Sequence, residues 1–206
     1  MFTEVTKAIR PAIVLLILLA VVTGLVFPAL ITGIAQVAMP AQANGSIIRN
    51  GDRVIGSELI AQGFEAPRYF HPRPSAAGKG YDASASAATN LAPGSKDLRD
   101  AIAARVADAR AQGLTGVSVP PDLVTTSASG LDPDLSPDAA LSQVARIAKA
   151  RGIATAEVEA LVRENVAYPL FGIIGEPHVN VLLLNLQLDR AAVNRQPDGQ
   201  APNTAQ

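Results

Sequence analysis

Residues 11–35 form the longest apolar run of the chain and contain no charged side chain. A helix needs about 20 predominantly apolar residues to cross the hydrocarbon core of a bilayer, and this run is longer. A cleaved signal peptide is the alternative interpretation, but its apolar region is only about 7–15 residues long. The pattern therefore predicts an uncleaved transmembrane helix over residues 11–35 in the lipid bilayer, preceded by an N-terminal segment of residues 1–10.

After this helix, the apolar and polar positions follow the pattern of an ordinary globular domain. Residues 36–45 have the composition of a connector, and residues 46–55 alternate around Asn50-Gly51, a dipeptide typical of tight β-hairpin turns. Over residues 69–93, Pro, Gly, Ser and Asn then interrupt any regular spacing of apolar residues that would indicate a helix or a strand. This composition predicts a long loop.

Three later segments carry the signals of helices. Ser95 is placed to cap a helix that stops at Gly113, and Ser136 is placed to cap a second helix that ends at Gly152. A third helix is expected over residues 155–165, where the same pattern repeats.

The C-terminal part of the domain has a different pattern of apolar residues. Residues 179–188 are rich in Val and Leu and alternate in their second half, which predicts a buried β-strand. Residues 191–206 have the composition of a disordered tail. Strands at both ends with helices between them favour an α+β fold over a repeating βαβ array. We predict one N-terminal transmembrane helix followed by a single mixed α+β soluble domain over residues 46–190.

Basic residues flank only one end of the predicted transmembrane helix. Lys7 and Arg10 precede it, whereas the first basic residue on the far side is Arg49. Because cytoplasmic flanks carry the excess of Lys and Arg, the N-terminus is predicted to be cytoplasmic. The soluble domain is then expected outside the cytoplasm, in a periplasm or its equivalent.

The composition of the exported part argues against nucleic-acid binding and against sites built on cysteine. Setting aside Glu4, Lys7 and Arg10 from the 17 basic and 18 acidic residues leaves 15 and 17, a net charge of −2 that does not attract nucleic acid. The chain has no cysteine, which excludes disulfides and thiolate metal sites.

Local motifs for phosphate or metal binding fail on their spacing. Gly78-Lys79-Gly80 lacks the earlier glycine and the following Ser or Thr of a phosphate loop, so we interpret it as a flexible loop. The two histidines, His71 and His178, have no partner at the spacing of helical metal ligands. No metal site is predicted.

The signature of a hydrolase is incomplete. Residues 127–130 resemble a nucleophile turn, but glycine is missing two residues before Ser129. A triad with remote partners would have to use His71 or His178 as its base. We predict no catalytic residue, and a free-standing membrane-anchored periplasmic enzyme or receptor is the alternative function.

Two polar groupings are candidates for recognition. Residues 68–75 combine two arginines, two aromatic rings and two prolines, which suits either a rigid recognition surface or a segment with core rings and solvated arginines. Gln143 and Arg146 lie three residues apart on one face of the helix that follows Ser136. On spacing alone, such a pair is interpreted as the solvated face of the helix.

A series of short motifs runs through the chain in a fixed order. They are Gly56-Ser57-Glu58-Leu59-Ile60-Ala61-Gln62, Tyr69-Phe70 with Arg73-Pro74-Ser75-Ala76, Asn90-Leu91, Val119-Pro120 with Asp122-Leu123-Val124-Thr125, Ser129-Gly130-Leu131-Asp132-Pro133, Gly175-Glu176-Pro177, and Val179-Asn180-Val181-Leu182 through Asn185-Leu186. Together they resemble the family of the C subunit of the bacterial Kdp potassium-transporting ATPase. The resemblance covers nearly the whole chain, including the N-terminal span.

The resemblance implies a non-catalytic accessory subunit of an inner-membrane complex that couples ATP hydrolysis to potassium uptake. Its partners would be the potassium-channel-like A subunit, the P-type ATPase B subunit that hydrolyses ATP, and the small F subunit. No stably bound cofactor is implied. In this family the C subunit is proposed to act as a catalytic chaperone that raises the ATP affinity of the pump subunit through a transient complex with ATP. The proposed nucleotide contact maps to Gln143.

The charge pattern and the resemblance place the domain and ATP in different compartments. ATP is cytoplasmic, whereas Lys7 and Arg10 put the domain on the other side of the membrane. A nearly neutral domain without a phosphate loop fits a cap or brace over the potassium entrance. We therefore expect assembly and gating of the transporter as the physical role, with Gln143 as the residue that tests the nucleotide role.

Overall fold

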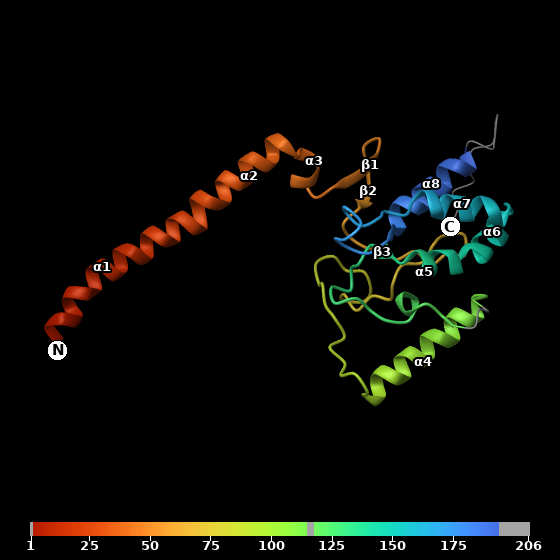
Figure 1. Ribbon diagram of the computed structural model, residues 1–206, viewed down its shortest axis with the longest axis horizontal. Helices are drawn as coiled ribbons and strands as arrows, with labels where there is room; N and C mark the ends of the chain where they lie inside the picture. The colour runs from red at the N-terminus through yellow and green to blue at the C-terminus, as the bar shows by residue number, and fades with distance from the viewer. Residues whose placement is uncertain (1, 115–117, 194–206) are drawn as a thin grey trace. The chain divides into compact units, whose positions relative to one another are not determined.

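The structure, a computed structural model, describes residues 2–114 and 118–193 (Figure 1). The chain divides into two compact units, and the division falls between Ser57 and Glu58. The fold is α+β, as predicted, with one long N-terminal apolar helix and a second unit that mixes helices with very short strands.

The first unit contains the long helix and a β-hairpin. Its elements are α1 (Phe2–Val21), the π-helical turn η1 (Val22–Val26), α2 (Phe27–Ala38), α3 (Pro40–Ala43), β1 (Ile47–Asn50) and β2 (Arg53–Ser57). The stretch Lys7–Ala38 is the one helix in the described part of the chain that is long and apolar enough to cross a membrane. It extends beyond residues 11–35 at both ends.

The π-helical turn ends two residues before a proline. Pro28 has no backbone N–H, so the normal helical hydrogen bond to the preceding turn cannot form there. One turn earlier, the Thr23 hydroxyl donates to the carbonyl of Leu19 at 2.8 Å. The helix therefore continues past Pro28, and its wider π-helical turn accommodates the missing hydrogen bond.

The predicted hairpin is confirmed. β1 and β2 pair antiparallel, with Asn50 opposite Arg53 and an irregularity between Ile48 and Arg49. Gly51 takes a φ of +59° in the turn, a value that glycine adopts without steric cost.

The second unit consists of a helical group, one outlying helix and long irregular connections. Its elements are α4 (Lys96–Ala111), the 3₁₀ turn η2 (Pro121–Leu123), β3 (Asp134–Leu135), α5 (Pro137–Ser142), α6 (Val144–Arg151), α7 (Thr155–Glu164), β4 (Val179–Asn180) and α8 (Val181–Val193). α7 packs against α5, α6 and α8, whereas α4 lies apart from this group (Figure 1). The predicted loop over residues 69–93 contains no helix or strand.

The sequence located the helix starts correctly. The Ser95 hydroxyl accepts a hydrogen bond from Leu98 N at 3.2 Å, and the Ser136 hydroxyl accepts one from Ala139 N at 3.3 Å. Gly152 ends α6 in the left-handed conformation. The predicted single helix after Ser136 is divided at Gln143, which separates α5 from α6.

The predicted strand over residues 179–188 is wrong. Only Val179 and Asn180 are extended, and they pair with β3, after which α8 begins. The Asn180 side chain accepts a hydrogen bond from Leu183 N at 3.1 Å, which satisfies a free N–H of the first turn. α8 continues to Val193, so it includes the first three residues of the predicted tail, and residues 194–206 lie outside the described part of the chain.

The core of the second unit is aliphatic and lies among α5, α6, α7 and α8. Phe70, from the long loop, is its one fully buried aromatic ring among the described residues. The other large buried members are Leu135, Ile147, Val158, Val162, Val179, Leu184 and Leu188. The core therefore fixes the loop segment around Phe70 against the helices.

Candidate functional site

The segment around Phe70 is held by two buried carboxamides, Gln143 and Asn185. Phe70 N donates to Asn185 Oδ1 at 2.8 Å, and Asn185 Nδ2 donates to Phe70 O at 3.0 Å. The next residue repeats the arrangement, because His71 N donates to Gln143 Oε1 at 2.8 Å and Gln143 Nε2 donates to His71 O at 3.0 Å. Each side chain satisfies both backbone groups of one residue, as a neighbouring strand would. We call Gln143 and Asn185 the amide clamp.

Gln143 is therefore not on a solvated helix face. Its side chain is 1% exposed, and so is that of Asn185. The expectation of a solvated pair was wrong because three-residue spacing shows only that Gln143 and Arg146 share a face. It does not show that the loop covers that face.

Arg146 fixes the same segment through backbone carbonyls. Its Nη1 donates to Pro67 O at 2.6 Å and to Tyr69 O at 3.0 Å, while Nη2 donates to Gln143 Oε1 at 2.6 Å. Burial lowers the pKa of Arg146 to about 10, which leaves the guanidinium charged at neutral pH. The predicted pair of Gln143 and Arg146 thus does meet, in a buried network that joins α6 to the loop.

His71 lies beside this guanidinium. Its Nε2 is 3.3 Å from Arg146 Nη1 and 3.1 Å from Ala66 O. Burial, followed by the positive charge of Arg146, lowers the pKa of His71, although the contact with Ala66 acts in the opposite direction. The imidazole is therefore neutral at neutral pH.

Residues 68–75 combine features of both interpretations, the recognition surface and the segment with core rings. Phe70 is core, whereas the Tyr69 ring contacts two guanidinium groups, those of Arg68 and Arg151, each 5.0 Å from its centroid. The Tyr69 hydroxyl donates to Asp189 at 3.0 Å, and Arg151 also pairs with Asp189 at 2.8 Å. Burial and the Asp189 carboxylate raise the pKa of Tyr69.

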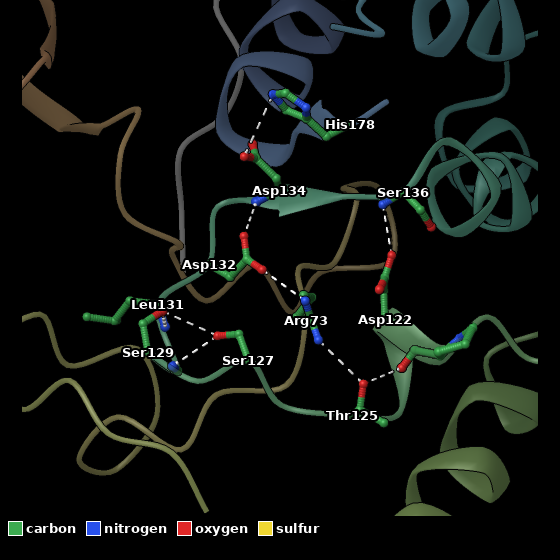
Figure 2. A network of polar contacts seen from close by, with 12 residues as sticks. Arg73, Asp122, Thr125, Ser127, Ser129, Leu131, Asp132, Asp134, Ser136 and His178 are labelled. Atoms are coloured by element: carbon green, nitrogen blue, oxygen red, sulfur yellow. Dashed lines mark hydrogen bonds and ion pairs between the residues drawn. The ribbon is translucent and has the colours of Figure 1, made fainter. Parts of the chain in front are cut away.

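Arg73 connects the segment to the loops before α5, as Figure 2 shows. Its Nη1 donates to Asp132 at 2.9 Å, and the other oxygen of Asp132 accepts from Asp134 N at 3.1 Å. Nearby, Asp122 accepts from Ser136 N at 2.8 Å (Figure 2). These carboxylates are engaged in fixing backbone, which is a structural use.

The serines of residues 127–130 are also engaged in a turn. The Ser127 hydroxyl accepts from Gly130 N at 3.0 Å, and the Ser129 hydroxyl accepts from Leu131 N at 3.1 Å (Figure 2). A side chain at Gly130 would meet Ala87 O at 2.5 Å, so the loops approach too closely here for any residue but glycine. His178 lies elsewhere, 4.0 Å from Asp134. The described contacts therefore do not pair Ser127 or Ser129 with a histidine base.

Two hollows border the clamped segment at His71. One has a volume of about 250 Å³, and its wall includes Gln143, His71, Tyr81 and Arg105. The other, of about 840 Å³, is bordered by His71 together with Arg146 and Lys149. The end of α4 and the residues that follow it contribute to the lining of both hollows.

These features define a membrane-anchored α+β domain whose polar side chains chiefly fasten its own backbone. A family model described as K+-transporting ATPase, c chain, matches residues 9–190. The chain belongs to this family, KdpC.

Curated relatives carry the same description over nearly their full lengths. The potassium-transporting ATPase KdpC subunit of Allorhizobium ampelinum is 52% identical over 188 residues, which are 91% of this chain and 98% of that protein. The KdpC subunit of Myxococcus xanthus is 50% identical over 92% of this chain and 89% of its own length. That of Caulobacter vibrioides is 52% identical over 88% and 92%.

Sequence reasoning missed Asn185, although it lies in a quoted motif. The signal was present: a lone Asn among leucines in residues 181–188 is costly to bury unless its amide is bonded. Interpreting this segment as a strand concealed that signal, because alternation assigns every second residue to solvent.

Proposed function

We propose that this protein is a non-catalytic accessory subunit of an ATP-driven potassium uptake complex in the bacterial inner membrane, where it assembles and stabilises the complex. Family membership over residues 9–190 is the observation that carries the proposal. The helix Lys7–Ala38 supports it, because this helix can hold the subunit beside membrane partners. The network around the amide clamp supports it as well, since a rigid domain suits a brace.

The partners we propose are the channel-like A subunit, the P-type ATPase B subunit and the small F subunit. They follow from the family resemblance, and ATP hydrolysis is assigned to the B subunit. The proposed orientation has a cytoplasmic N-terminus and a periplasmic domain, in line with Lys7 and Arg10 before the span.

Co-purification tests the proposal. The full chain is co-expressed with the other ATPase subunits, the pump subunit carries an affinity tag, and detergent extracts are purified on that tag. We expect the chain to elute with the tagged subunit in a constant ratio through size exclusion. Recovery of the chain only as a lone monomer would instead favour the alternative, a free-standing anchored enzyme or receptor.

The nucleotide role is a second candidate function, favoured by one observation. Gln143 borders the hollow of about 250 Å³, so a bound group there would lie against its side chain. Its side-chain amide makes four hydrogen bonds, to His71, Arg146 and Ala139. A nucleotide contact at Gln143 would therefore require one of these bonds to be exchanged.

Paired variants separate contact from structure. In the assembled complex, Gln143→Ala should weaken the apparent ATP affinity if the residue contacts the nucleotide. Asn185→Ala is the matched control, because Asn185 clamps the same segment but does not line the hollow. An equal loss in both variants would assign the effect to the fold of the segment, and no change in either would remove Gln143 from the nucleotide site.

A further inference from the structure

The connection between α7 and β4 exposes a compact apolar projection. Its members are Tyr168, Leu170, Phe171, Ile173 and Ile174, whose side chains are between 60% and 85% exposed. Soluble surfaces rarely gather large apolar side chains in this way unless the patch binds something. We call residues 168–174 the apolar finger.

The finger has a defined shape and a firm base. Ala167 and His178 exchange backbone hydrogen bonds of 2.8 and 3.0 Å, and Leu170 N donates to Ile174 O at 3.0 Å. Just beyond this ladder, Val179 is fully buried in the core. The projection therefore presents its side chains from a fixed stem.

Phe171, at the tip, is held in an unusual conformation. Its φ is +55°, a value that bulky residues adopt at an energetic cost, and its side chain is the most exposed of the finger at 85%. Strain of this kind persists where the surrounding structure enforces it, and it is common at binding sites. The tip thus directs an aromatic ring outward.

Charge distinguishes a protein partner from a lipid surface. Residues 165–175 contain no charged side chain, and the first one after them is the acidic Glu176. Loops that bind anionic bilayers rely on Lys and Arg for attraction to the headgroups, and this finger has none. Tyr and Phe, by contrast, are enriched at the centres of protein interfaces, where charged residues are depleted.

We propose that the apolar finger inserts into an uncharged, apolar pocket on another subunit of the potassium-transporting ATPase. This inference rests on the proposed function, because the occupant is a partner in the same complex. Membrane anchoring of both proteins raises their effective concentration, so a small contact such as this is sufficient to position the domain.

Photo-crosslinking identifies the occupant. A benzophenone amino acid replaces Phe171 in the full chain, which is co-expressed with the other subunits and irradiated in intact membranes. We expect a covalent adduct with one ATPase subunit, mapped by mass spectrometry. Adducts with lipid alone, or no adduct at all, would overturn the proposal, and the lipid result would assign the finger to the bilayer.

A polar variant of the finger provides a second, independent test. Asn tolerates positive φ better than Phe, so Phe171→Asn with Ile173→Thr makes the tip polar without disturbing its backbone. We expect retention of this variant on the tagged pump subunit to fall about tenfold or more. The matched control, Phe171→Leu with Ile173→Val, keeps the tip apolar and should be retained. Equal thermal unfolding of both variants would verify that the domain stays folded.

The outcomes distinguish this inference from the proposed function. If the wild-type chain co-purifies with the ATPase and the polar variant does so equally well, the finger proposal alone is wrong. If the wild-type chain itself fails to co-purify, both proposals are wrong.

Discussion

At the scale of single residues, Gln143 and Asn185 replace the strand that the segment around Phe70 lacks. An extended segment inside a helical domain has N–H and C=O groups that must be paired, because unpaired buried groups are costly. Two carboxamides, one at the junction of α5 and α6 and one on α8, satisfy the four groups of Phe70 and His71. The same arrangement brings Gln143 next to the hollow where the nucleotide role would have to operate.

Each clamp residue should stabilise the domain. Gln143→Ala or Asn185→Ala leaves one buried backbone N–H and one C=O without partners, so each should lower the free energy of unfolding by about 1–3 kcal/mol. The double variant should cost less than the sum, because a segment released on one side is less well placed on the other. Denaturant unfolding of the full chain in detergent, followed by circular dichroism, measures these values.

A third amide serves as the control for the clamp. Gln187 is half-buried and bonds to the Asn165 side chain rather than to the segment. Gln187→Ala should add to Gln143→Ala without coupling. Strict additivity of the two clamp substitutions would show that they do not act on one segment.

His71 should make stability depend on pH. Its pKa lies below the usual 6.5 in the folded domain, because of burial and then the charge of Arg146. As the pH falls below about 6.5, the unfolded chain therefore binds the proton first, and stability decreases until the lowered folded pKa is reached. Unfolding midpoints between about pH 7.5 and 5.5 should fall in the wild type and less in His71→Gln.

The second histidine provides the comparison for that experiment. His178 is on the surface of the domain, and substitution to Gln should leave the fall in stability largely in place. A wild-type midpoint that stays constant down to about pH 5.5 would contradict the assignment to His71.

At the scale of elements, α8 shows how a polar residue on a buried face can disguise a helix. Val181, Leu184, Asn185 and Leu188 all face the core, which is the helical spacing of i, i+3, i+4 and i+7. Because Asn185 breaks the apolar pattern, the leucines on either side of it alternate as in a strand. The helix is favoured by the Asn180 cap and by the bonds that Asn185 makes to Phe70.

Two neighbouring leucines of α8 differ strongly in burial. Leu184 is 1% exposed and Leu183 is 36% exposed. Leu184→Ala should therefore cost about 2–5 kcal/mol of unfolding free energy, whereas Leu183→Ala should cost less than about 1 kcal/mol. Denaturant midpoints of the two variants measure the difference, and equal losses would be inconsistent with α8 as described.

At the scale of the whole molecule, the side of the membrane on which the domain lies determines which molecules it can contact. Because the chain has no cysteine, single cysteines can report the side without background. Ala103, exposed on α4, and Ala8, which precedes the uncharged run of residues 11–35, are suitable positions. With outer-membrane access ensured, an impermeant maleimide should label Ala103→Cys in intact cells and Ala8→Cys only after lysis.

The reverse labelling pattern would change the proposed function. A cytoplasmic domain could contact ATP directly at Gln143, and the nucleotide role would then become the first candidate. Labelling as expected would require any effect on ATP to pass through the membrane-embedded partners.

The sequence alone determined what depends on neighbouring residues. The long apolar helix, the hairpin at Asn50-Gly51, the caps at Ser95 and Ser136, and the stop at Gly152 all follow from local chemistry, and all are present. The order of the motifs likewise indicated the family, and the comparisons confirmed it.

Only the tertiary structure decided what depends on residues far apart in the chain. Gln143 is 72 positions from His71, and Asn185 is 115 positions from Phe70, so no local pattern could show that their amides meet that backbone. The bonds from Asn185 to Phe70 likewise favour a helix over a strand in the segment after Asn180. Burial is a property of the assembled fold, and it determined which polar residues became structural.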